Sequence, residues 1–593
     1  MPIKAEYQTE TYLKKLADVT SQSVVECRFS PGDGVSELLA VCPQVCPAVC
    51  EAASGRINYG GRLVCTAVYA GVDGRLGRAQ KGAEFTHFAE GENFAPAQTA
   101  FCRLGCERVT VRREGSSFVV SAVISAHISV YGSAERCLLT SADGAVCDMR
   151  PAKLLTAVTF SGESEVEDDF EAAGVEDILM HDARCVVTDC RCGAGEIRIN
   201  GEICLSLLAV RGQEPVTLDR TIPFSAEILC DDAVASCRAQ CCCQLAEAAV
   251  SAQVNEERGR CAVNFSARLK FFGEFCASHE VVCAADAFRT DGTAEVEMCT
   301  EAPLTCDDIK VWSERVGGVC SVSAKLDYGC ALKAVVLPSA ECTWSADTGV
   351  LEGAVNATLI YSRGGEMHGA EITLPFSAAL SGSENAIVTG VAVSGVSVRQ
   401  RAEGECEAEA VLRITAAVCT HKECSYVCRI GDGRDDETEP CAISVLVPEP
   451  GETLWSAAKR LKLPPERVQE ACAGATFPLS GSERILIYRR KQYNTYSSIA
   501  AAQPRQFCAC VKIILVIAPP PCYNALYGMR SADACKTQFN AARHGRGGRL
   551  SHARQHSYHR GDLRRGARKA APRWQGKRRG ARRGARRPPR GQE

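Results

Sequence analysis

Hydrophobic and polar residues alternate along much of the chain, which is the two-residue period of a β-strand with one buried face. The clearest case lies between Cys261 and Phe271, where every second residue is apolar. These apolar positions are Cys261, Val263, Phe265, Ala267, Leu269 and Phe271. We expect a strand whose other face meets water. A second strand over Ala249–Val254 and a turn at Arg258–Gly259 would complete a hairpin.

The same β pattern recurs along the sequence. Gly201 opens an apolar run that is followed by Pro223-Phe224-Ser225, and Gly353 opens another that is followed by Pro375-Phe376-Ser377. The distance from glycine to phenylalanine is 23 residues in both copies. A looser copy runs from Gly61 to Phe85. Because self-similarity of this kind indicates a repeat architecture, we predict a mainly β protein with three antiparallel β domains.

A different pattern begins at Ile443. Strand-like alternation over Ile443–Pro450 gives way to a helical pattern, in which Leu454, Ala457, Ala458 and Leu461 fall on one face. Thr453 is the expected N-cap of this helix, and Pro464-Pro465-Glu466 begins a second helix. A turn at Leu479–Arg484 then leads to a closing strand at Ile485–Tyr488. The predicted order is β, α, α, β.

These segments carry two resemblances. Pro450–Trp455, Leu463–Glu466 and Gly481 before Ile485–Ile487 resemble a LysM module. The glycine and Pro-Phe-Ser motifs, placed ahead of such a module, are similar to the SPOCS-domain family of endospore coat proteins. The predicted domains are therefore SPOCS-like β domains at residues 1–155, 156–310 and 311–440, a LysM at 441–490, and a disordered tail at 491–593.

The resemblance implies a function of scaffolding rather than catalysis. Proteins of this kind bind a SpoIVA-like coat ATPase through the LysM, and related modules bind peptidoglycan, a polymer that contains N-acetylglucosamine. The resemblance also implies a shallow groove that binds the partner or the glycan. The residues expected at this groove are Gly451, Glu452, Thr453, Leu454, Trp455, Gly474 and Phe477. Trp455 is either a surface anchor or a core residue of the first helix. Cys472 replaces the Asn usual in LysM modules, and the loop Ala473–Pro478 lacks polar side chains suited to amide recognition.

Charge is divided unevenly along the chain. The net charge of -3 combines an acidic body with a tail, Ala541–Glu593, that holds 18 basic residues and two acidic ones. An arginine-rich and glycine-rich tail neutralises phosphates, so RNA binding is a second alternative function; the other interpretation is a frameshifted or fused tail without selected function. The run Glu163–Asp177 contains eight acidic residues and no basic one. We expect it to be a solvated connector or an edge strand.

The 36 cysteines offer the most obvious chemistry, but their spacing does not indicate a site. The chain has no C-x-x-C motif. Two clusters remain, Cys42–Cys50 and Cys237–Cys243, and the first has no histidine nearby to complete a metal site. We therefore expect free thiols, with late oxidative cross-linking between molecules as an alternative. His279-Glu280-Val-Val-Cys283 lacks the second histidine of a zinc protease motif. No catalytic residue, metal ligand or cofactor is predicted.

The start of the sequence bears on location. Met1–Glu10 has acidic residues where a secretory signal needs an apolar core, and the longest apolar stretch, Ile513–Ala518, is too short to span a bilayer. We expect no membrane span and a cytoplasmic protein in the mother cell, located at the forespore surface and spore coat. Exposed strand edges of the β domains would favour self-association.

Overall fold

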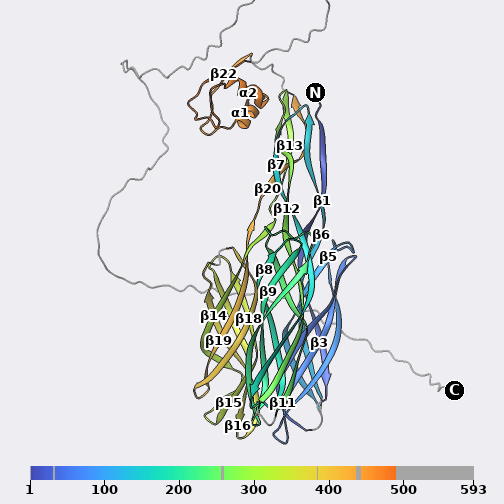
Figure 1. The fold of residues 1–593 in the computed structure, drawn as a ribbon, viewed down its shortest axis with the longest axis vertical. Coiled ribbons are helices and arrows are strands. Elements are labelled where there is room, and N and C mark those ends of the chain that lie inside the picture. Colours follow the sequence, from blue (N-terminus) through green and yellow to red (C-terminus); the bar gives the residue numbers. More distant parts are fainter. Residues whose placement is uncertain are drawn as a thin grey trace, which may run out of the picture. The chain divides into compact units, whose positions relative to one another are not determined.

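The computed structural model describes residues 2–30, 34–115, 117–255, 260–382, 385–435 and 442–488. Within these residues the chain is mainly β, with two short helices near residue 460 (Figure 1). Neither helix in this described part has the length and apolar character that crossing a membrane requires. The predicted tail, the apolar stretch at Ile513–Ala518 and the turn at Arg258–Gly259 lie outside the described residues.

The first part of the chain forms two facing antiparallel sheets. One has the strand order β1-β6-β5 and the other has the order β2-β3-β4. The bounds are β1 Lys4–Phe29, β2 Val35–Ala53, β3 Arg56–Gly71, β4 Leu76–Glu90, β5 Thr99–Glu114 and β6 Ser117–Asp143. One apolar cluster, which includes Tyr59, Leu63 and Ile124, fills the space between the sheets. We call this the first sandwich.

The second sandwich has the same arrangement, with sheets β7-β12-β11 and β8-β9-β10. Its bounds are β7 Val146–Ala173, β8 Asp177–Cys192, β9 Glu196–Arg211, β10 Glu214–Leu229, β11 Ala239–Asn255 and β12 Arg260–Phe288. The predicted alternation in β12 is confirmed: Cys261, Val263 and Phe265 are at most 1 % exposed, whereas Ala262 and Asn264 are exposed. Strand β12 extends well past Phe271, which the alternation did not predict.

The third sandwich repeats this strand order once more. Strands β14, β19 and β18 form one half and β15, β16 and β17 the other, and β14 joins the halves through Ser321 and Val322 opposite β17. The bounds are β14 Leu304–Val322, β15 Cys330–Ser345, β16 Val350–Arg363, β17 Glu366–Ala379, β18 Ala386–Ala402 and β19 Glu405–His421. Strands β7 and β14 run across the boundaries predicted at residues 155 and 310.

The glycine of each sequence copy has the same structural task. Gly61, Gly201 and Gly353 lie on the middle strand of their three-stranded sheets, β3, β9 and β16. A β-carbon added at any of them would collide with a backbone carbonyl oxygen of the preceding strand, at Cys46, Val186 or Glu341. Glycine is therefore required because two backbones approach closely at this point.

A shared apolar core joins the sandwiches. Val68, Leu208 and Ile360 each lie seven residues after the repeat glycine, and all three are at most 1 % exposed. They belong to one cluster together with Leu39 and Val336. Burial of each such side chain is worth about 1.5 to 3 kcal/mol, so the cluster holds the sandwiches together by apolar contact.

Beyond the sandwiches, β1, β6, β7 and β12 continue as paired ribbons next to a further pair, β13 Gly292–Glu301 with β20 Cys424–Asp435 (Figure 1). We call these three ribbons the ribbon bundle. Apolar side chains from the ribbons, among them Leu138, Leu139, Ala284 and Val427, pack inside it. The bundle is built from strands far apart in sequence, which no local pattern predicts.

The acidic run forms the outer end of β7, so the edge-strand alternative is confirmed for Glu163–Ala173. Strand β7 pairs only with β12 in its sheet. Basic side chains neutralise part of its charge: Arg220 contacts Asp168, and Arg260 Nη1 lies 2.5 Å from Glu171 Oε2. Charge on an exposed edge opposes pairing with further strands.

Candidate functional site

The candidate site lies in the small module formed by β21 Ile443–Leu446, α1 Leu454–Leu461, α2 Pro465–Ala471 and β22 Ile485–Tyr488. The order of these elements is the predicted one. The apolar face of α1 also agrees with the sequence pattern, since Ala457 and Ala458 are fully buried. Leu454 and Leu461 pack against the same cluster, which includes Leu446, Val468 and Ile487.

Two of the expected binding residues hold the start of α1. Thr453 accepts a hydrogen bond from Ser456 N at 3.2 Å, and Ser456 Oγ accepts one from Thr453 N at 2.9 Å. This capping box confirms the predicted N-cap. Glu452 is 9 % exposed; its carboxylate accepts hydrogen bonds from Arg460 Nη2 at 2.7 Å and from Glu449 N at 3.1 Å. Glu452 and Thr453 are therefore occupied in holding the local fold.

Trp455 faces the ribbon bundle. Its indole Nε1 donates a hydrogen bond of 2.8 Å to Asp286 Oδ2 on β12, and its ring meets Phe288 edge-on at 5.1 Å. Lys459 Nζ binds the same carboxylate at 2.7 Å. Burial alone would raise the pKa of Asp286, but the hydrogen bonds from Lys459 and Trp455 lower it below its usual range. The contact joins the module to β12 through one carboxylate.

The other expected residues differ in their exposure. Gly451 and Gly474 have φ of 85° and 103°, which suits glycine, and both are exposed. Gly451 N donates to Leu479 O at 2.8 Å, which joins the loop before α1 to the loop before β22. Phe477 and Leu454 are half-buried in the same apolar cluster. Gly451, Thr453 and Gly474 are thus the exposed members of the set.

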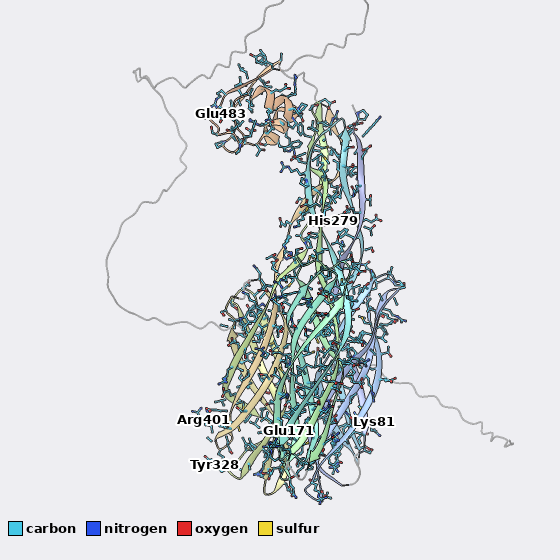
Figure 2. All side chains as sticks on the ribbon, viewed as in Figure 1. Lys81, Glu171, His279, Tyr328, Arg401 and Glu483 are labelled. Atoms are coloured by element: carbon cyan, nitrogen blue, oxygen red, sulfur yellow. The ribbon has the colours of Figure 1, made fainter. Side chains whose placement is uncertain are left out.

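The turn before β22 is held by an acidic side chain. Glu483, labelled in Figure 2, accepts hydrogen bonds from Ser480 N at 3.0 Å and Gly481 N at 2.9 Å. These backbone donors favour the charged form and lower the pKa of Glu483 to about 2. The turn that borders the exposed loops is therefore ordered by a carboxylate that stays ionised at neutral pH.

A polar centre that the sequence analysis missed lies in the ribbon bundle. Arg136 on β6 is 3 % exposed, and its guanidinium donates to Glu10 Oε2 at 3.1 Å and to Glu301 Oε2 at 3.0 Å. It also donates to Leu155 O at 3.1 Å and to Thr156 Oγ1 at 3.2 Å. We call this set the arginine hub. One side chain thereby connects β1, β6, β7 and β13.

The hub extends to the remaining ribbon strands. Tyr426 on β20 donates to Glu301 Oε1 at 2.6 Å. His279 on β12, labelled in Figure 2, has its Nε2 3.2 Å from Glu10 Oε2. Burial and the neighbouring Glu301 raise the pKa of Tyr426. The sequence did contain a local sign of this hub. Arg136 occupies an inward position of an alternating strand, two residues before the fully buried Leu138. His279 belongs to this structural network, as does the Glu10 of the amino-terminal segment.

Two cavities lie where sandwiches meet. The first, about 270 Å³, is bordered by β2, β5, β8, β11 and β18, and its walls include Arg103, Asp182, Arg184 and Cys242. The second, about 340 Å³, lies between β2 and β5 on one side and β7 and β12 on the other, and its walls include Phe101 and Lys270. Neither contains any residue of the predicted binding set.

The cysteines in the described residues are all free thiols. Pro43 and Pro47 accompany Cys42, Cys46 and Cys50 on β2, which is a strand rather than a helix. Over the described ranges, no group of three or more His, Cys, Asp or Glu side chains is placed to hold a metal ion. Several of these free thiols nevertheless lie next to another cysteine in space, which their spacing in the sequence did not reveal.

Comparison of the chain with protein-family models, with curated proteins and with solved structures gave no match.

Proposed function

We propose that the chain is a non-enzymatic scaffold of endospore coat assembly, built from three SPOCS-type repeats and a carboxyl-terminal LysM. The observation that supports this most is the recurrence of one strand order in three sandwiches, each with a glycine at the same backbone contact. Scaffolds need a rigid body, and here a shared apolar core and the arginine hub unite the sandwiches and ribbons.

In this proposal the module docks onto a SpoIVA-like coat ATPase at the forespore surface. Trp455 is directed to Asp286, which leaves the exposed loops around Gly451 and Gly474 as the docking surface. The loop Ala473–Pro478 offers backbone groups and a single polar side chain, Thr476, which suits a protein partner better than the acetamido groups of peptidoglycan. Exposed Thr476 lies in the second loop and offers a position at which docking can be blocked.

The test is a pull-down from sporulating cells with the full chain as bait. We expect the coat ATPase to be recovered with the native chain and lost with Thr476→Arg, which introduces a large charge into the loop. Glu470→Arg on the exposed surface of α2 is the matched control and should retain the ATPase. Binding to purified peptidoglycan without recovery of the ATPase would instead favour the glycan-binding alternative. Recovery of RNA alone would favour the second alternative, RNA binding through the basic tail.

A further inference from the structure

Several cysteine pairs lie between the sheets of the first and second sandwiches, among them Cys185 with Cys243, and two of the pairs occupy equivalent positions. Cys50 on β2 and Cys102 on β5 pack in one apolar cluster and line one cavity, and Cys190 on β8 and Cys241 on β11 pack in a second cluster. Within each pair, the neighbouring thiol contributes to the raised pKa of Cys102 or Cys241. In each sandwich the two strands belong to opposite sheets. The side chains therefore meet in the core, in the manner of the inter-sheet disulfide of immunoglobulin domains.

The two pairs occupy the same structural position. Cys50 lies opposite Tyr59 and Cys190 lies opposite Ile199, and each of these partners is two residues before the repeat glycine. In the third sandwich the corresponding residue is Trp344, opposite Leu351. Its indole donates a hydrogen bond of 2.8 Å to Ala386 O on β18. The position thus bridges the sheets in every sandwich, twice through sulfur and once through an indole.

At least one thiol of each pair borders a cavity. Cys50 and Cys102 line the cavity of about 340 Å³, and Cys241 lines the cavity of about 270 Å³. A further pair between sheets, Cys27 and Cys65, packs in the cluster of the first sandwich but lines neither of these two cavities. Its residues are 2 % and 0 % exposed. Since neither thiol borders these cavities, Cys27–Cys65 is an internal reference for a thiol pair without access through them.

We propose that Cys50–Cys102 and Cys190–Cys241 are disulfide-forming sites that a peroxide entering the cavities oxidises. In each pair one thiolate attacks the peroxide, one oxygen–oxygen bond breaks, and water or an alcohol leaves with a sulfenic acid formed on sulfur. The second thiol attacks that sulfenic sulfur and releases water. Per pair, two thiols lose two protons and two electrons, and the peroxide takes up both and is reduced.

Burial explains why the thiols persist until such an oxidant arrives. The neighbouring thiol of Cys50 and burial raise the pKa of Cys102, and burial raises the pKa of Cys241. Since the thiolate is the reactive form, both pairs oxidise slowly in a reducing compartment. Once formed, a bond between two sheets shortens the free chain of the unfolded state and so stabilises the sandwich.

The test treats the full chain with hydrogen peroxide, alkylates the remaining thiols and maps the cross-linked peptides by mass spectrometry. We expect peptides that join Cys50 to Cys102 and Cys190 to Cys241, each lighter by two hydrogens, while Cys27 and Cys65 are still alkylated. Cys50 or Cys190 found as sulfinic acid, or joined to a second molecule, would overturn the proposal. Equally fast oxidation of Cys27–Cys65 would remove the role given to the cavities.

A stability measurement tests the same pairs independently. Oxidised native protein should unfold at a higher urea concentration than reduced protein, and Cys50→Ser should lose the part of this shift that comes from the first sandwich. Cys342→Ser, at a half-buried thiol in the third sandwich, is the matched control and should retain the whole shift. Cys102→Ala provides a second removal of the first pair, and an unchanged shift in both Cys50→Ser and Cys102→Ala would contradict the proposal.

Discussion

Removal of the arginine hub should open the ribbon bundle. The guanidinium of Arg136 is nearly inaccessible to water and bonds to the carboxylates of Glu10 and Glu301, whose side chains are 16 % and 18 % exposed. Arg136→Ala leaves both carboxylates without this partner in a partly buried site. Loss of one partner of a buried ion pair costs about 3 to 5 kcal/mol, and we take about 3 kcal/mol because the carboxylates are partly hydrated.

A cost of about 3 kcal/mol corresponds to a factor of about 100 in the equilibrium for local opening. Hydrogen exchange of the β13 amides, Gly292–Glu301, measures this opening, because these amides pair with β20. Exchange should accelerate by about that factor in Arg136→Ala. Arg136→Lys keeps the charge but loses the planar fork of donors, so its exchange should be intermediate.

The matched control for this experiment is Arg315→Ala. Arg315 is 75 % exposed and pairs with Glu409 at 3.1 Å, a surface pair worth about 0 to 1 kcal/mol. It should leave β13 exchange unchanged. If Arg136→Ala exchanges no faster than Arg315→Ala, the hub does not hold the ribbons together and the argument from burial is wrong.

Three further predictions concern the shared core, the repeat glycine and the module contact. Ile360→Ala should lower the free energy of unfolding by about 2 to 5 kcal/mol in urea titrations, since it leaves a cavity where three sandwiches meet; a loss under about 1 kcal/mol would show that the sandwiches are independent. Gly201→Ala should cost about 1 to 3 kcal/mol because its β-carbon meets a carbonyl oxygen, whereas Gly431→Ala, with open space around it, should be neutral in the same titration. The depressed pKa of Asp286 means that its stabilising contact with Lys459 is fully present above the usual value of 3.8 and is lost as pH falls through the lower folded value, so exchange of the α1 amides should accelerate there. Asp286→Asn should show fast exchange at neutral pH with no further acid step, and an acid step of native size in that variant would contradict the assignment.

Local patterns in the sequence predicted the features that depend on interactions between residues close together in the chain. Alternation identified the buried face of β12, and the repeat glycines marked three copies of one β pattern. That these glycines lie where two backbones approach closely became clear only from the structure. The helical face and the cap at Thr453 were predicted because side chains three and four residues apart share a helix surface. Each of these features depends on residues within one turn or one hairpin.

The remainder depends on contacts that link distant segments. Arg136 and Glu301 are 165 residues apart, so neither side chain carries a sign of the other in its own stretch of sequence. The pairing of Cys50 with Cys102 required knowledge of which sheets face each other, since the cysteine spacing matched no known framework. The contact of Trp455 with Asp286 was hidden for the same reason.

The shared core at Val68, Leu208 and Ile360 lies between sandwiches of one chain, and this affects how the protein responds to dilution and to amino-acid substitution. An assembly of three identical subunits would separate at low concentration and would be obliged to use the same amino acid at all three points. Joining the three sandwiches in one chain removes both restrictions. The sandwiches are always at high effective concentration, and each can carry its own residue at the junction. Valine, leucine and isoleucine can then fit one asymmetric junction. Likewise, Trp344 can take the place of a cysteine in the third sandwich without a change in the other two.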